Sequence, residues 1–233
     1  MVTLTRLARA ARRYIATGKL RCAPGPMIED FFGGKDCFFV QVGSNDGIFR
    51  DPLHELIRSN PLWRGIFIEP LKEAFDRLVG NYSGESRFAF EQTAISDSAD
   101  DRWFYFVSPQ AGLPREMSAI SSFDRSYVLN HLSNMKLVEP AACIGATRVR
   151  CEPLMSVLGR HQVAHIDLLH IDAETYDYQI LRQLDFNRYC PKLILYEHCA
   201  LSAGDYQAAA SLLSRQGYRL VNCRIDTLAV RRD

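Results

Sequence analysis

Hydrophobic residues follow two alternating patterns along this chain. Short apolar runs typical of buried strands occur at 37–42, 65–69, 87–95, 166–172 and 193–198. Between them, apolar residues three or four apart predict helices over 51–59, 71–79, 176–184 and 205–216. Two more strands, over 218–223 and 227–230, are expected to pair as a hairpin. Because helices and strands alternate, we predict an α/β fold with a mostly parallel sheet and helices on both faces.

The middle of the chain departs from this alternation. Residues 103–107 and 147–151 are predicted as strands, the first outside the parallel sheet, and 153–158 as a short helix. Residues 108–145 are the least regular part, broken by proline and glycine near both ends. A segment of this size inside a compact domain is typical of a lid or a substrate loop.

The first strand runs directly into a glycine turn. Phe38–Val42 is followed by Gly43-Ser44-Asn45-Asp46-Gly47, and Asp51 is expected to cap the helix that comes next. Strand, glycine turn and helix form the ligand crevice in open α/β sheets. Glu69 ends the second strand, where an acidic side chain can bind the two hydroxyls of a ribose.

The glycine turn favours S-adenosylmethionine over a dinucleotide. It reads G-x-x-x-G and carries Asp46, whereas nicotinamide-binding loops read G-x-G-x-x-G and approach a pyrophosphate. A carboxylate repels a pyrophosphate and attracts a sulfonium or an α-ammonium group. The alternatives are an NAD-dependent oxidoreductase and a plain strand–turn–helix corner without a ligand.

Ionisable side chains follow several predicted strands, so they should meet at one edge of the sheet. They are Asp46, Glu69, Asp172, Glu174, Glu197 and His198. Asp172, His198 and Glu174 are candidate catalytic bases, with His131 of the insertion as a further candidate. Asp172, Glu174 and Glu197 could together hold Mg²⁺, although no metal is expected, because acidic strand ends also suit a donor alone.

Composition narrows the class of protein. The chain has 233 residues, 47% of them hydrophobic, and a formal net charge of +1. Such a balance fits one large domain and argues against nucleic acid as the main partner. Seven cysteines occur without a C-x-x-C pair or zinc-ligand spacing. With no secretory signal and no apolar run of membrane-spanning length, we expect a cytoplasmic protein.

Residues 1–28 form a basic extension. They contain six lysines and arginines and no acidic residue, and their apolar positions lie on one helical face. This pattern predicts an accessory helix, or a peripheral contact with an anionic membrane surface. Residues 22–26 look like a linker, and 29–233 are predicted to form a single domain.

Several motifs in order resemble the FkbM family of S-adenosylmethionine-dependent methyltransferases. They are Val42–Gly47, Asp51–Leu53, Trp63–Pro70, Asp167–Asp177, Tyr196–His198, Gly217–Tyr218 and Asp226–Ala229. The resemblance covers roughly residues 37–230. The family usually has glycine where this chain has Thr175, so the backbone after the fourth core strand could differ.

The resemblance implies a Rossmann-like class I methyltransferase fold, with a seven-stranded sheet whose last strand is antiparallel. It implies transfer of a methyl group to a hydroxyl of a small molecule, such as a sugar or a natural-product intermediate. By position, Gly43 and Asp46 would line the methionine end of the donor and Glu69 would hold the ribose, within a donor site that also includes Ser44, Asn45 and Gly47. Ala94 and Ile95 would lie near the adenine, and Asp172 beside the methyl group. A non-catalytic binding module on this scaffold remains an alternative.

Overall fold

A computed structural model describes residues 23–114, 117, 119–135, 137 and 139–232. The basic helix predicted within residues 1–22 lies outside the described residues. In the described part of the chain, no helix is both long enough and apolar enough to cross a membrane.

The main sheet has seven strands in the order β10-β11-β9-β8-β1-β2-β3. Their bounds are β1 Cys37–Val42, β2 Trp63–Ile68, β3 Phe88–Glu91, β8 Leu168–Ile171, β9 Leu193–Glu197, β10 Tyr218–Cys223 and β11 Asp226–Arg231. Neighbouring strands run parallel from β3 to β9, whereas β11 is antiparallel to both β9 and β10. The predicted seven-stranded sheet with an antiparallel last strand is confirmed.

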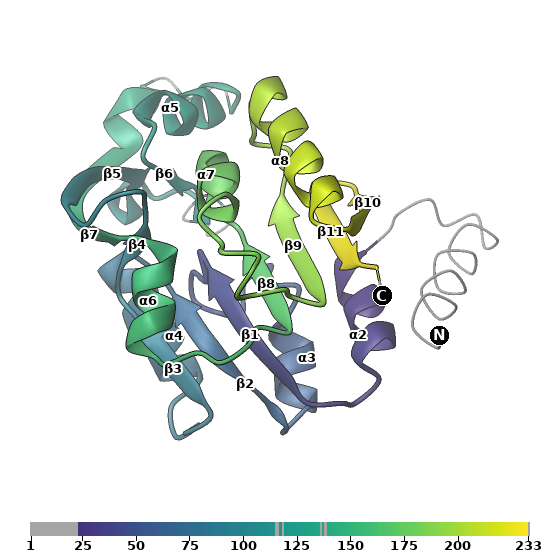
Figure 1. Cartoon of the computed structure of the whole chain (residues 1–233). Helices are drawn as coiled ribbons and strands as arrows, with labels where there is room; N and C mark the ends of the chain where they lie inside the picture. The colour runs from purple at the N-terminus through teal and green to yellow at the C-terminus, as the bar shows by residue number, and fades with distance from the viewer. Residues whose placement is uncertain (1–22, 115–116, 118, 136, 138, 233) are drawn as a thin grey trace.

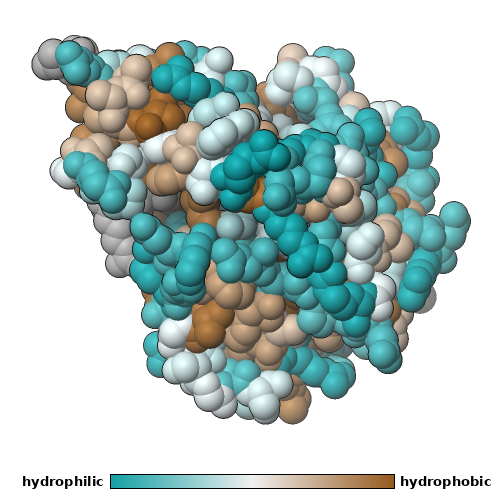
Figure 2. Space-filling model, turned by 90° about the vertical axis from the view of Figure 1, so that its left-hand side faces the viewer, coloured by the Kyte–Doolittle hydropathy of each residue, from teal (hydrophilic) through white to brown (hydrophobic). Residues whose placement is uncertain are grey.

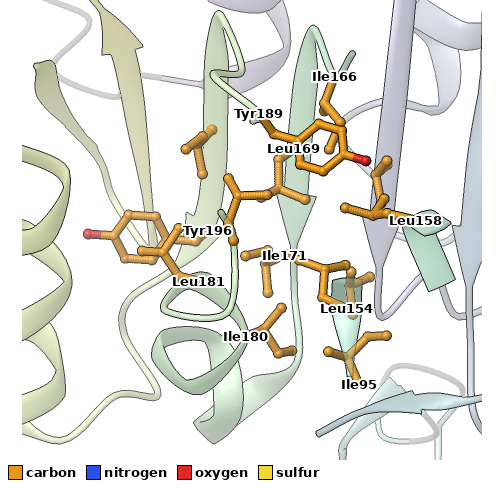
Figure 3. Close-up of a cluster of buried hydrophobic side chains, with 14 of the residues drawn as sticks. Ile95, Leu154, Leu158, Ile166, Leu169, Ile171, Ile180, Leu181, Tyr189 and Tyr196 are labelled. Carbon is orange, nitrogen blue, oxygen red and sulfur yellow. The ribbon is translucent and has the colours of Figure 1, made fainter. Parts of the chain in front are cut away.

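Helices cover both faces of this sheet, as predicted (Figure 1). On one face lie α6 Leu154–Arg160, α7 Asp177–Leu181 and α8 Ala203–Arg215. Their apolar side chains pack on β8 and β9; Figure 3 shows Leu154 of α6 and Ile180 of α7 near Ile171 of β8. On the other face lie α2 Pro24–Phe32, α3 His54–Ser59 and α4 Lys72–Asn81. The sheet is therefore buried on both sides, which explains its continuous apolar runs.

Helix α2 corrects the predicted linker and domain boundary. Pro24 stands in the first turn of this helix, where its fixed φ and missing N–H are tolerated. Met27, Ile28 and Phe32 are buried against the main sheet. The proline and glycine at 24–26 therefore begin a helix of the domain, and the boundary expected at residue 29 falls inside it.

A second, four-stranded sheet has the order β4-β7-β5-β6. Its strands are β4 Ala94–Ile95, β5 Asp101–Val107, β6 Ser121–Ser122 and β7 Ile144–Glu152. The single strand predicted over 87–95 was wrong: β3 stays in the main sheet, while β4 pairs with Cys151–Glu152 of β7. The break falls before Thr93, whose hydroxyl donates to the carbonyl of Arg150 at 3.0 Å. Strand β5 lies outside the parallel sheet, as predicted.

The insertion 108–145 contains the short 3₁₀ turns η1 Pro109–Ala111 and η3 Pro140–Cys143, strand β6, and helix α5 Arg125–Ser133. Asp124 caps α5 by accepting from the Ser126 amide at 2.8 Å. This helix lies at the end of the molecule toward which β8 and β9 point (Figure 1). Seen from the side of the second sheet, polar residues dominate the surface and hydrophobic ones form separate patches (Figure 2).

Candidate functional site

A cavity of about 790 Å³ opens at the carboxyl edge of the main sheet. Its size falls within the range of ligand-binding cavities, about 300–1,000 Å³. The glycine turn after β1, the ends of β2 and β8, and the insertion all contribute to its wall. Of the ionisable residues predicted to meet at this edge, Glu69, Asp172, Glu174 and Glu197 line the cavity, whereas Asp46 and His198 do not.

Gly43 sets the shape of the turn after β1. Its φ is +78°, and a Cβ there would lie 1.7 Å from the carbonyl oxygen of Asp172. The backbone of the turn thus packs directly against the end of β8. Ser44 ties the turn to both neighbours, because its hydroxyl donates to the Gln41 carbonyl at 3.1 Å and accepts from the Ile68 amide at 3.2 Å.

Asp46 and Gly47 shape the turn without lining the cavity. The Asp46 carboxylate accepts from the amides of Ile48 and Phe49 at 3.0 and 2.8 Å, and Asp46 borders a separate pocket. Gly47 has φ +70°, and its carbonyl accepts from the Tyr82 hydroxyl at 2.8 Å. The structure brings Gly43, Ser44 and Asn45 to the cavity and places these two residues behind them.

Glu69 lies in the cavity wall at the end of β2. One carboxylate oxygen accepts from the Asn45 amide at 2.8 Å, and the other from the Leu71 amide at 2.9 Å. Burial raises the pKa of Glu69 to about 7, and the two backbone donors oppose that shift. Each oxygen has a second lone pair, so Glu69 can accept further hydrogen bonds from two hydroxyls. Ala94 and Ile95, predicted near the adenine, line the same cavity.

A polar group that we did not predict lies on the other side of the glycine turn. Gln41 and His170 face each other across β1 and β8, and Asp51 lies beside them. Gln41 Oε1, His170 Nδ1 and Asp51 Oδ2 are buried without a hydrogen-bond partner among the described residues, and all three residues line the cavity. Burial lowers the pKa of His170 to about 4, so its ring is neutral. The sequence signal was a polar residue inside each of two apolar strands.

Asp51 does not cap α3 as expected. The Oδ1 atom of Asp51 accepts from the Leu53 amide at 2.8 Å. This hydrogen bond closes a turn before the helix, which begins only at His54. Burial raises the pKa of Asp51 to about 7.

Three carboxylates meet at the ends of β8 and β9. Oxygen atoms of Asp172, Glu174 and Glu197 all lie within 4.8 Å of one another, close enough to share a proton or a divalent cation. The surrounding cavity wall raises the pKa of each, although the Asp172 side chain is itself exposed, and the neighbouring Asp172 charge raises those of Glu174 and Glu197 further. Asp177 supports the cluster from beneath, since its carboxylate accepts from the amides of Ala173 and Glu197 at 3.3 and 3.1 Å.

The insertion contacts this acidic cluster. Tyr127 of α5 donates a hydrogen bond to Glu174. Thr175, at the position where the family usually has glycine, shares a hydrogen bond with Ser122 at 2.9 Å. The residue in the left-handed region is Glu174, with φ +56°, and not Thr175. The backbone after β8 therefore needs no glycine at 175.

The two candidate histidines lie in different places. His131 projects from α5 into the cavity wall. His198 does not line the cavity; its Nδ1 contacts the Thr227 hydroxyl at 3.0 Å, and its ring lies 5.4 Å from that of Tyr206. The structure thus brings Asp172 and Glu174 together and leaves His198 apart from them.

The acidic cluster predicts a pH-dependent stability. Burial and neighbouring charges raise the pKa of Glu197 to about 9, so the folded state holds this proton more tightly than the unfolded state. The free energy of unfolding should therefore fall as pH rises from about 5 to 9. Glu197→Gln removes the carboxyl group, and with it the loss of stability that its ionisation causes. We therefore expect the melting temperature of this variant to exceed that of the wild type at pH 8 but not at pH 4.5. A gain of about 1 kcal/mol corresponds to about 2–4 °C.

The matched control is Glu55→Gln, because the Glu55 side chain is 90% exposed. Thermal unfolding of this variant should follow the wild type at both pH values. Equal melting temperatures for Glu197→Gln and the wild type at pH 8 would show that the pKa of Glu197 is not raised in the folded state.

The strand order and the antiparallel last strand define a class I methyltransferase fold. The chain belongs to the FkbM family: the family described as "Methyltransferase FkbM domain" matches residues 41–220. It is therefore an S-adenosylmethionine-dependent methyltransferase. No match was found among curated proteins.

Three solved structures with similar folds share little sequence identity with this chain. A precorrin-6y C5,15-methyltransferase from Geobacter metallireducens is 8% identical and has a TM-score of 0.44, over 84% of this chain and 81% of that one. An S-adenosylmethionine-dependent O-methyltransferase from Thermotoga maritima is 9% identical, with a TM-score of 0.46 over 94% and 69%. Aeropyrum pernix fibrillarin, with natively bound S-adenosyl-L-methionine, is 10% identical, with a TM-score of 0.44 over 84% and 68%.

Proposed function

We propose that the chain transfers the methyl group of S-adenosylmethionine to a hydroxyl of a small molecule, a sugar or a natural-product intermediate. The observation that carries this proposal is the acidic cluster of Asp172, Glu174 and Glu197, which lies in the same cavity as Gly43 and Glu69. A hydroxyl must lose its proton when it attacks a methyl group, and a carboxylate with a pKa near neutrality suits that role. The family assignment favours this function over the NAD-dependent oxidoreductase considered from the sequence.

The donor fits the residues on the cavity wall. Glu69 would accept hydrogen bonds from the ribose hydroxyls, and Ala94 and Ile95 offer an apolar surface for the adenine. The unpartnered acceptors on Gln41, His170 and Asp51 suit an ammonium group, which carries three N–H donors. When bound, the donor supplies an electrophilic methyl group on a sulfonium.

Asp172 is the proposed base. Its carboxylate faces the cavity at the end of β8, and the surrounding protein raises its pKa to about 6. Glu174 can share this proton, because its carboxylate oxygen lies within 4.8 Å of one on Asp172, whereas Glu197, with a pKa of about 9, already holds a proton near neutral pH. Positioning the hydroxyl against the methyl group can lower the barrier by about 7–11 kcal/mol, and a base adds about 10²–10⁴-fold. Mg²⁺ is not required by this scheme.

Three further expectations remain proposals. They are a cytoplasmic location, the absence of nucleic acid as a partner, and peripheral membrane contact through the basic residues of 1–28. His198 also remains a candidate base by sequence, although its place outside the cavity wall favours Asp172.

Calorimetric titration with S-adenosylmethionine and S-adenosylhomocysteine tests the donor site. We expect micromolar binding by the wild type and a loss of about 10²–10⁴-fold in Glu69→Ala. This variant removes charged hydrogen bonds, each worth about 1.5–3 kcal/mol, and leaves the amides of Asn45 and Leu71 without their acceptor.

Glu55→Ala, on the exposed side of α3, is the control and should bind as the wild type does. Absence of binding by a folded wild-type sample would contradict the proposed function. Unchanged binding by Glu69→Ala would contradict only the ribose role of Glu69.

A further inference from the structure

The donor leaves one end of the cavity unassigned. If the donor lies along Gly43, Glu69 and Ala94, the rest of the wall comes from the insertion and from the loops after β9 and between β10 and β11. The acidic cluster forms the boundary between the two ends. At the remaining end, an acceptor hydroxyl can therefore reach both the donor and a base. This inference rests on the proposed function.

One face of the α5 region forms the upper wall of this end. Tyr127, His131 and Met135 are four residues apart, so they follow one side of the helix and its continuation. All three line the cavity, and the rings of Tyr127 and His131 lie 4.7 Å apart. This stripe begins at the acidic cluster, through the Tyr127–Glu174 hydrogen bond, and runs outward to Met135.

Apolar side chains form a large part of the wall around this stripe, beside the polar residues Ser121 and Asp226. Met117 and Ile120 of the insertion line the cavity, and Ala200 and Ile225 line it from the two loops. Met135 and Ile225 are 37% and 43% exposed, although large apolar side chains are usually covered. Exposed apolar side chains that face a cavity are typical of a binding surface for an apolar ligand.

The insertion contacts the segment 174–176, which includes Glu174 of the acidic cluster, at three points. Besides the Tyr127–Glu174 bond, Ser122 and Thr175 share a hydrogen bond at 2.9 Å. The rings of Phe123 and Tyr176 pack edge to face with centroids 5.1 Å apart. These contacts hold the apolar wall in a fixed position relative to the carboxylates. A fixed position is needed if the wall is to select one acceptor over another.

We propose that the acceptor carries its reactive hydroxyl on an apolar body. The hydroxyl lies at the acidic cluster, and the body extends along Tyr127 and Met135 toward Ile225. A small, fully hydroxylated sugar would leave this wall in contact with water, whereas a hydroxyl compound with an alkyl or aromatic portion would bury it. The apolar portion thus contributes the affinity, and the carboxylates select the hydroxyl.

Alkyl glucosides of increasing chain length test this proposal. Methyl, butyl and hexyl β-D-glucoside share one hydroxylated head and differ only in apolar length. Each is titrated into wild-type protein saturated with S-adenosylhomocysteine. Because burying two methylene groups corresponds to about a tenfold change in affinity, hexyl glucoside should bind at least tenfold more tightly than methyl glucoside.

A pair of variants locates the effect. Met135→Glu places a charge on the proposed wall and should weaken hexyl glucoside binding at least fivefold. Its affinity for S-adenosylhomocysteine should be unchanged. Leu62→Glu makes the same change at a 60% exposed leucine that does not line the cavity, and should have no effect.

Equal affinities for the methyl and hexyl glucosides, or binding of neither, would overturn the apolar acceptor. Equal effects of Met135→Glu and Leu62→Glu on hexyl glucoside binding would also overturn it. These results are distinguishable from failure of the methyltransferase function, since the titrations are made only after S-adenosylhomocysteine is seen to bind. If it does not bind, the proposed function fails first.

Discussion

Asp172→Asn is expected to lower the rate of methyl transfer by about 10²–10⁴-fold while donor binding stays within a few-fold of the wild type. The amide has nearly the same shape as the carboxylate and cannot accept the proton of a hydroxyl. The carbonyl of residue 172, against which Gly43 packs, belongs to the backbone and is unchanged. The measurement is single-turnover methyl transfer to a hydroxylated acceptor, together with calorimetric titration of the donor.

The pH profile adds a second readout. In the wild type, activity should rise with pH through the pKa of Asp172, which the surrounding cavity wall raises to about 6. The variant should lose this rise. Asp76→Asn, on the exposed side of α4 and paired with Lys72, is the matched control and should be fully active. If Asp172→Asn transferred the methyl group at the wild-type rate, Asp172 would not be the base, and Glu174, Glu197 or His198 would be the remaining candidates.

Gly43→Ala is expected to abolish detectable donor binding and to destabilise the fold. The new Cβ would lie 1.7 Å from the Asp172 carbonyl oxygen, and backbone at φ +78° is strained for alanine. The turn and the end of β8 must then separate, which deforms both the donor loop and the acidic cluster. We expect a loss of about 3 kcal/mol or more in the free energy of unfolding, measured by urea denaturation, because overpacking and backbone strain add.

Gly80→Ala is the control for this prediction. Gly80 lies in α4, where a Cβ would meet no heavy atom within 4 Å. Since alanine favours helix, this variant should be as stable as the wild type or more stable by about 0.4–1 kcal/mol, and it should bind the donor normally. Donor binding by Gly43→Ala at wild-type affinity would mean that the turn does not form the donor site.

Much of the fold could be predicted because each core strand is a continuous apolar run. Burial on both faces produced that signal for Phe38–Val42 and Leu193–Glu197, and both strands are where the pattern placed them. The run 87–95 misled because apolar residues continue through a change of sheet, and local periodicity carries no information on which partner a strand chooses. Pro24 misled for a similar reason, since proline suits a linker and a first helical turn equally.

The site was predictable where position in the sheet decides function. Asp172, Glu174 and Glu197 follow strand ends and do meet, as Glu69 and Gly43 meet the cavity. Asp46 was assigned to the donor by charge, but it does not line the cavity, and one of its carboxylate oxygens accepts from the amides of Ile48 and Phe49 in its own turn. Gln41 and His170 were missed, because their partnership arises from the register of two strands far apart in sequence.

The second sheet has a consequence for how this enzyme could change its substrate. The chain leaves the main sheet after β3. Its short strand β4 then pairs with the end of β7, where the Ser96 amide donates to the Glu152 carbonyl at 3.0 Å. The whole intervening excursion thus begins and ends at one point. Evolution could exchange it for a different excursion while Gly43, Glu69 and Asp172 stay in place. The donor chemistry would be inherited, and the range of acceptors would be free to diversify.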